Sequence, residues 1–152
     1  MEQVLNDAKK DYNAPMHSAE HIMNQTMIQM FNCGRSVRNH IEKKKSKCDY
    51  CFNRNLTVEE IAEIETKVNE IISQHLPISE VLITRTEAQE RFNLSKLPGE
   101  AGDTIRIISI GDYDACPCIG THVTNTSEIG HFRIISTDYN EGILRIRYKL
   151  DN

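Results

Sequence analysis

Hydrophobic positions recur along this chain with two spacings, one typical of helices and one typical of strands. A helix is predicted over about residues 15–31, with Asn13 as its N-cap. Four methionines lie at helical spacing along it: Met16, Met23, Met27 and Met30. Pro15 suits the first turn, and Gly34 is expected to end the helix.

A second helix is predicted within residues 56–76, LTVEEIAEIETKVNEIISQHL. Thr57 and Glu60 have the spacing of a capping box, and Pro77 lies beyond the end of the helical pattern. Residues three and four positions apart form one face, which we expect to be buried: Ile61, Ile64, Val68, Ile71 and His75.

Strands are predicted where apolar and polar residues alternate or where short apolar runs occur. These segments are 47–52, 79–84, 104–110, 131–137 and 142–150. The first of them would bury Cys48, Tyr50 and Phe52 on one face. A short helix is expected at 86–92, a loop at 97–103, a turn at 111–114 and a loop or irregular hairpin at 34–47. The fold class that follows is α+β, with an antiparallel or mixed sheet and helices packed on one face.

The composition indicates a single domain over residues 1–152, in which residues 1–12 are loosely held. Hydrophobic residues make up 39% of the chain, which is enough for one core. No apolar run approaches the roughly 18 to 20 residues of a membrane span, and the polar N-terminus has no signal-peptide pattern. We therefore expect a cytoplasmic protein whose five cysteines stay reduced, and their odd number argues against a disulfide framework.

The net charge of -4 does not favour nonspecific nucleic-acid binding, but basic residues are concentrated in two segments. The first is segment 34–47, with Arg35, Arg38, Lys43, Lys44, Lys45 and Lys47. The second is the last predicted strand, in which Arg145, Arg147 and Lys149 alternate with apolar residues. Each set could be a solvated face or a surface that binds phosphates, and the sequence leaves both interpretations open.

Candidate metal ligands come from two short segments of the sequence. HSAEH puts His17 and His21 on one face of a helix, one turn apart, and Cys118 and His122 in CIGTH have the same spacing. Three imidazoles and one thiolate together suit zinc. The zinc-protease motif HExxH does not fit, because Ser18 rather than a glutamate follows the first histidine.

Other cysteine pairs compete with this assignment. Cys48 and Cys51 form a CxxC, and Cys116 and Cys118 form a CxC, so a four-cysteine site is formally possible. A strand at 47–52 would turn Cys48 and Cys51 to opposite faces, which hinders joint ligation of one ion. Cys116 could take the place of Cys118 as a ligand, but we expect it to pack or to support Cys118, because Cys118 keeps the spacing of four with His122.

The two ligand segments also carry a family resemblance. HSAEH, followed far downstream by CIGTHVTNTSEIGHF, resembles the editing domain of alanyl-tRNA synthetases, and the helix at 56–76 with Asn69 is similar as well. The resemblance extends from about residue 14 to 150. It identifies the chain as similar to the short, freestanding AlaX-type editing proteins and implies the fold of the synthetase second additional domain.

The activity that this resemblance implies is zinc-dependent hydrolysis of mischarged aminoacyl-tRNA, chiefly seryl-tRNA(Ala). Serine exceeds alanine by one hydroxyl, and a site that hydrogen-bonds this hydroxyl can reject alanine because alanine would leave a buried polar group unpaired. Thr121 and Ser36 are the candidate residues for binding the hydroxyl, and Thr121 is also a candidate catalytic residue.

The remaining candidates concern water activation and contacts with tRNA. Glu20 could act as a base, Gly120 could allow a close approach of substrate or metal, and Arg35 and Arg38 could bind phosphates of the tRNA 3′ end. The sequence leaves open whether zinc activates water or only orients the substrate. It also leaves open a hydrolase acting on another misacylated tRNA or small ester, and a non-enzymatic, zinc-stabilised module that binds tRNA or protein. It does not give the oligomeric state.

Overall fold

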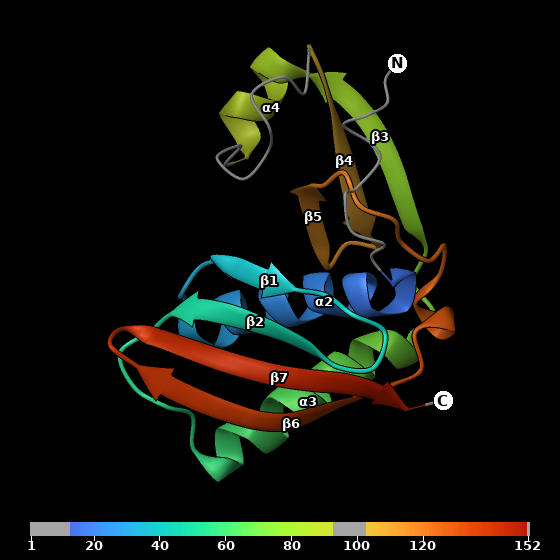
Figure 1. Cartoon of the computed structure of the whole chain (residues 1–152). Coiled ribbons are helices and arrows are strands. Elements are labelled where there is room, and N and C mark those ends of the chain that lie inside the picture. The colour runs from blue at the N-terminus through green and yellow to red at the C-terminus, as the bar shows by residue number, and fades with distance from the viewer. Residues whose placement is uncertain (1–12, 93–102, 152) are drawn as a thin grey trace.

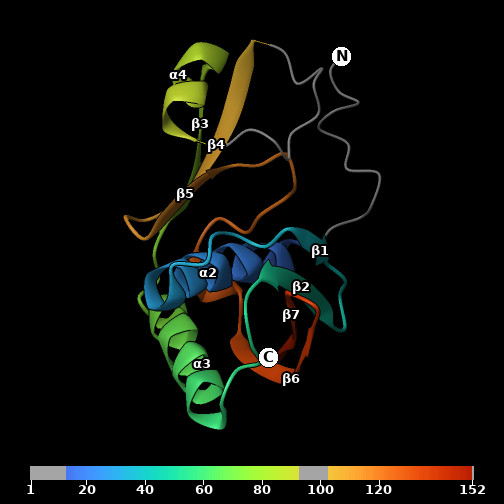
Figure 2. The same cartoon turned by 90° about the vertical axis from the view of Figure 1, so that its left-hand side faces the viewer.

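The computed structural model describes residues 13–92 and 103–151, which form an α+β fold with two antiparallel sheets (Figures 1 and 2). In chain order its elements are α2 (Ala14–Phe31), β1 (Arg38–His40), β2 (Ser46–Cys51), α3 (Val58–Ser73), β3 (Ile78–Thr84), α4 (Arg85–Arg91), β4 (Thr104–Ile110), β5 (Asp114–Pro117), the 3-10 turn η1 (Thr126–Glu128), β6 (His131–Asn140) and β7 (Ile143–Asp151). The predicted loose N-terminus at 1–12, and the predicted loop at 97–103 up to residue 102, lie outside the described residues.

The seven strands divide between a four-stranded sheet, in the order β1-β2-β7-β6, and a three-stranded sheet, in the order β3-β4-β5. Every neighbouring pair is antiparallel. The predicted α+β class is confirmed, but the sequence indicated one sheet where the strands form two. The predicted loop or irregular hairpin at 34–47 contains β1 and the turn into β2, the predicted strand at 47–52 corresponds to β2, and β5 follows a turn that the sequence did predict.

Helix α2 lies between the two sheets, so that its two sides have different partners (Figures 1 and 2). One side contributes to the main core: Met16, Ala19, Ile22, Met23 and Met27. The other side buries polar side chains, namely His17, Glu20, His21 and Asn24. This division explains how one helix can hold both the core and a polar site.

The ends of α2 follow local sequence signals. Asn13 caps the N-terminus, because its side chain accepts a hydrogen bond from the backbone N–H of Met16 at 3.1 Å. The C-cap is Asn32, which adopts the left-handed conformation with φ 56° and donates its N–H to the carbonyl of Ile28. The helix was predicted to end at Gly34, two residues beyond the observed C-cap. Asn32 can end it earlier because asparagine tolerates the left-handed conformation better than most residues.

Helix α3 packs against both α2 and β6. It thereby covers part of the main core. The predicted capping box of Thr57 and Glu60 is present. The prediction that one face of this helix is buried is confirmed for four residues: Ile64 and Val68 are fully buried, and Ile61 and Ile71 are partly buried. His75 is exposed, contrary to the prediction, because the helix ends at Ser73 and His75 adopts φ 55°. Ile72 is buried in its place.

Two polar side chains of α3 also bind the edge of the larger sheet. Asn69 donates to the carbonyl of Phe132 at 2.9 Å and accepts from its N–H at 2.8 Å, while Glu65 accepts from the N–H of Ile134 at 2.7 Å. The helix therefore satisfies backbone groups of β6 that an open sheet edge would leave unpaired. Among the helices of the described ranges, none combines the length and the apolar character that crossing a bilayer requires.

Candidate metal centre

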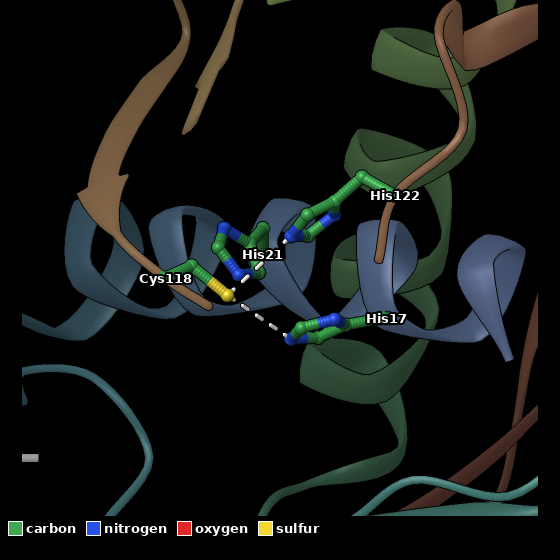
Figure 3. Close-up of side chains that lie close together, drawn as sticks. All are labelled: His17, His21, Cys118 and His122. Atoms are coloured by element: carbon green, nitrogen blue, oxygen red, sulfur yellow. Dashed lines mark hydrogen bonds between the residues drawn. The ribbon is translucent and has the colours of Figure 1, made fainter. Parts of the chain in front are cut away.

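The four predicted ligands come together above α2, although they lie at opposite ends of the chain. His17 and His21 project from α2, and Cys118 and His122 project from the segment after β5 (Figure 3). One nitrogen of each ring and the sulfur atom all lie within 4.8 Å of one another. The predicted grouping of these residues is therefore present in the structure, and both histidines of α2 are buried.

The imidazoles point their Nε2 atoms at the centre of the group. Cys118 Sγ lies 3.4 Å from His17 Nε2 and 3.5 Å from His122 Nε2 (Figure 3). The His17 and His122 rings are stacked with centroids 4.2 Å apart, and the His21 ring stands nearly perpendicular to both.

In two of the rings, those of His17 and His122, the opposite nitrogen makes a hydrogen bond that fixes the orientation of the ring. His17 Nδ1 donates to the backbone carbonyl of Thr121 at 3.1 Å. A carbonyl can only accept, so the proton of His17 is on Nδ1 and the Nε2 lone pair is available to a metal. His122 Nδ1 lies 2.9 Å from Ser18 Oγ. Partners of this kind accompany metal-binding histidines in general.

His21 Nδ1 lies 3.6 Å from the Asp114 carboxylate, which is an ion-pair distance rather than a hydrogen bond. Asp114 is itself nearly fully buried, and Arg35 binds both of its oxygens at 2.8 Å and 3.2 Å. Gln25 donates to the same carboxylate at 3.2 Å. Asp114 thus connects His21 to Arg35, a role that no sequence pattern indicated.

The protonation states of Cys118 and His122 favour metal binding, whereas the raised pKa of His21 means that its ring must lose a proton when a metal binds. Burial alone would raise the pKa of the Cys118 thiol, but His21 and the hydrogen bonds from His122 and His17 hold this pKa well below its ordinary value, which favours the thiolate. Burial lowers the pKa of His122 to about 4, so its ring is neutral near pH 7. Burial opposes the charge on His21 as well, but Cys118, Asp114 and Glu20 outweigh it and raise the pKa of His21.

The donor set fits zinc. Three imidazole nitrogens and one thiolate sulfur are borderline-soft ligands, four in number, which is the set that tetrahedral zinc prefers. The fixed tautomer of His17 and the thiolate of Cys118 present the deprotonated atoms that a metal requires. The group is therefore able to bind a metal ion and is compatible with zinc.

Arg106 of β4 holds the segment that carries Cys118 and His122. Its guanidinium donates to the carbonyls of Cys118 at 3.0 Å and of Gly120 at 2.8 Å, and it also pairs with Glu80. The N–H of Cys118 in turn donates to the carbonyl of Arg106 at 3.2 Å. Cross-strand contacts of this kind fix the loop against the smaller sheet.

A cavity of about 700 Å³ adjoins the metal ligands. Its lining includes several residues that the sequence singled out: His17, Glu20, His21, Arg35, Ser36, Cys116, Cys118 and Gly120. Asn24 and Asn39 add polar groups, and Ile28, Val37 and Phe92 add apolar ones. The volume lies in the range typical of small-molecule sites.

Glu20 is the carboxylate of this cavity, and it is only 3% exposed. Its Oε1 lies 3.7 Å from the Nε2 atoms of both His17 and His21. Its Oε2 accepts hydrogen bonds from Asn24 at 2.5 Å and from Asn39 at 3.2 Å. One oxygen is therefore anchored while the other faces the metal ligands.

The two candidate hydroxyl residues lie in different surroundings. Ser36 is buried in the cavity wall, where its hydroxyl donates to Asn39 Oδ1 and lies 3.4 Å from Glu20 Oε2. Thr121 is exposed, and its backbone carbonyl rather than its side chain is what meets His17. The catalytic and substrate-binding roles of both residues stay predictions.

The two candidate arginines are engaged by acidic residues. Arg35 binds the buried Asp114, while Arg38 lies on the outer side of β1 and pairs with Asp49 at 3.2 Å. Cys48 and Cys51, which would belong to the alternative four-cysteine site, lie on opposite faces of β2. Cys48 is buried in the core and Cys51 is exposed, as their positions on a strand predicted. Cys116 lies in the cavity wall near Cys118.

Comparison with known proteins relates the chain to tRNA synthetases. Residues 105–147 match the family described as the threonyl and alanyl tRNA synthetase second additional domain. The chain is 32% identical over 138 residues to the alanine–tRNA ligase of Methanococcus vannielii, which covers 87% of the chain and 15% of the ligase. It is 35% identical over 108 residues to the alanine–tRNA ligase of Metallosphaera sedula, which covers 69% of the chain and 12% of the ligase.

A similar match, 36% identical over 108 residues, relates the chain to the alanine–tRNA ligase of Saccharolobus islandicus. The chain spans about 15% or less of the length of these ligases. The resemblance predicted from the sequence is thereby confirmed, and the chain is an alanyl-tRNA synthetase editing-domain-like protein.

Proposed function

We propose that the protein hydrolyses the ester bond of mischarged aminoacyl-tRNA, chiefly seryl-tRNA(Ala), with zinc bound by His17, His21, Cys118 and His122. The observation that carries this proposal is the group of four donors, two of them buried and two partly buried, beside a cavity of about 700 Å³. The similarity to alanine–tRNA ligases supports tRNA as the partner. In this proposal the aminoacylated 3′ end of the tRNA enters the cavity.

Four protein ligands complete a tetrahedral zinc site, so a bound zinc would polarise the ester carbonyl or lower the pKa of water only by accepting a further ligand. The protein supplies the base. Glu20 takes a proton from the attacking water, because its Oε1 faces the metal ligands at 3.7 Å while Asn24 and Asn39 hold its Oε2. The water oxygen bonds to the ester carbonyl carbon, the bond from that carbon to the ribose oxygen breaks, and the ribose oxygen receives a proton.

Ser36 binds the hydroxyl of the serine substrate in this proposal. Its buried position in the cavity wall, next to Glu20 and Asn39, supports the assignment. Alanine cannot make this hydrogen bond, and sites built around such a bond reject the analogue without the hydroxyl by about 10⁴-fold. Thr121 contributes through its backbone, which orients His17.

A panel of aminoacylated tRNAs tests the substrate assignment. We expect release of serine from seryl-tRNA(Ala) at a rate far above that of alanine from alanyl-tRNA(Ala), and preferential hydrolysis of another misacylated tRNA or a small ester would overturn this substrate assignment.

The variant His17→Ala with His21→Ala tests the role of the metal. Loss of hydrolysis with an intact circular dichroism spectrum supports an enzyme, whereas simple unfolding supports a structural metal. We also propose a cytoplasmic location, which suits both the tRNA substrate and the free cysteines.

A further inference from the structure

One face of the larger sheet is lined by basic side chains, and we refer to it as the basic face. Alternate residues of its strands, such as Cys48, Tyr50, Ile146 and Tyr148, are buried in the core against the helices. The residues between them therefore point to the opposite side. The basic face comprises Arg38, Lys47, Arg133, Arg145, Arg147 and Lys149, together with Lys43, Lys44 and Lys45 in the turn between β1 and β2.

Like charges stand directly opposite each other in two neighbouring rows of this face. Lys47 of β2 pairs in register with Arg147 of β7, and Lys149 of β7 pairs with Arg133 of β6. Directly opposed like charges destabilise a sheet. Asp151 already pairs with both Arg133 and Lys149, and Asp138 pairs with Arg147, so the cation left without a carboxylate among the described residues is Lys47. A bound anion beside Lys47 would reduce the remaining repulsion, so the arrangement suits a negatively charged partner.

The carboxylates near the basic face are already engaged. Asp49 accepts from Arg38 and Arg145 at 3.2 Å and 2.7 Å, and Asp138 accepts from Arg147. Asp151 pairs with Arg133 at 3.2 Å and with Lys149 at 3.6 Å, and Glu42 pairs with His40.

Four lysines of the basic face stand apart from these ion pairs. They are Lys43, Lys44, Lys45 and Lys47, and none of them makes an ion pair with another residue in the ranges 13–92 and 103–151. The first three are exposed and Lys47 is half-buried. A chain with a net charge of -4 thus concentrates unneutralised cations on one side.

Strand β1 separates the basic face from the cavity. Val37 and Asn39 line the cavity, whereas Arg38, between them, is on the basic face, and its side chain is 68% exposed. A ligand that lies across the basic face therefore reaches the cavity by crossing a single edge strand.

We propose that the basic face binds the phosphate backbone of the tRNA acceptor stem, whose single-stranded 3′ end crosses β1 into the cavity. The identity of this partner rests on the proposed function. A duplex presents a dense line of phosphates to such a row of cations, and proteins recognise duplex RNA largely through its backbone and shape. Arg35 is not part of the basic face, because it lines the cavity and binds the buried Asp114 there.

The triple variant Lys44→Gln, Lys45→Gln and Lys47→Gln tests the basic face without removing an ion pair of the described residues. Binding of a non-acylated acceptor-stem minihelix is measured by fluorescence anisotropy over a range of salt concentrations. We expect weaker binding and a salt slope reduced by about 1 per lysine. In the deacylation assay KM should rise while kcat stays unchanged. Lys67→Gln on α3, away from this face, is the matched control and should behave as the wild type.

Two outcomes would overturn the proposal: an unchanged salt slope and KM in the triple variant, or equally tight binding of a single-stranded RNA of the same length. The assay also separates this proposal from the proposed function. If the wild type hydrolyses seryl-tRNA(Ala) and the triple variant binds the stem normally, only the proposed role of the basic face in tRNA binding is refuted. If the wild type shows no hydrolysis and the triple variant loses stem binding, only the proposed deacylase activity is refuted.

Discussion

The carboxylate of Asp114 lies 3.6 Å from Nδ1 of His21, the buried ring nitrogen of this ligand that makes no hydrogen bond to the described residues. Arg35 holds this carboxylate with two hydrogen bonds. A carboxylate at the start of β5 thereby faces the ring of a metal ligand on α2, where partners of this kind orient the ring and raise its basicity once hydrogen-bonded.

Asp114→Asn should therefore weaken zinc binding. Loss of such a partner typically costs about 10- to 100-fold in metal affinity. The measurement is a competition titration against a chromophoric chelator near neutral pH. Asp112→Asn is the matched control, because Asp112 is exposed in the adjoining turn and should leave the affinity unchanged. Equal affinities of the two variants would show that Asp114 does not orient His21.

Glu20→Gln should separate catalysis from metal binding. The amide keeps an oxygen that can accept from Asn24 and Asn39, but it cannot take a proton from water. We expect a fall in kcat of about 10²- to 10⁴-fold, in the range of general base catalysis, with zinc content unchanged. Zinc content is measured by atomic absorption and kcat by single-turnover deacylation. Wild-type kcat in this variant would exclude Glu20 as the base.

Removal of zinc should lower the thermal stability of the protein. A bound ion would join α2 to the segment that carries Cys118 and His122, so its binding to the folded state alone would stabilise that state by mass action. Differential scanning fluorimetry with and without a chelator should show a fall in Tm for the wild type. The same treatment should leave the Tm of the His17→Ala, His21→Ala variant unchanged, and an equal fall in both proteins would indicate that the chelator acts elsewhere.

The ion pairs of Asp49 predict a pH dependence of stability. Hydrogen bonds from Arg145 and Arg38 lower the pKa of Asp49 in the folded protein below its unfolded value. Its contribution to stability is therefore complete above the unfolded pKa and is lost as the pH falls through the folded pKa. The difference in unfolding free energy between the wild type and Asp49→Asn should shrink from about pH 6 to about pH 3. Urea titrations measure it, and a difference independent of pH would contradict the prediction.

The sequence predicted the parts of this protein that depend on local spacing. His17 and His21 share a helical face because they are four residues apart, and Thr57 caps α3 because Glu60 follows at the required distance. The same spacing argument gave a wrong prediction for His75, because the helix ends at Ser73 and the turn that follows moves His75 away from the apolar face.

The parts that the sequence could not predict depend on contacts between distant segments. Strand β5 has only four residues and ends in a proline, so it carries no alternation of its own. Asp114 and Arg106 become important only because they meet His21 and the carbonyls of the ligand segment across the fold. Thr121 was identified by its neighbours in the motif, whereas its observed contact with His17 is made by a backbone carbonyl.

The most direct test of the account is the rate at which the zinc-loaded protein releases each amino acid from tRNA(Ala). With radiolabelled serine or alanine on the same tRNA, the account predicts rapid release of serine and almost none of alanine. It also predicts that Ser36→Ala narrows this difference. If the zinc-loaded protein at micromolar concentration leaves both seryl-tRNA(Ala) and alanyl-tRNA(Ala) intact, or hydrolyses both at the same rate, the central claim is wrong.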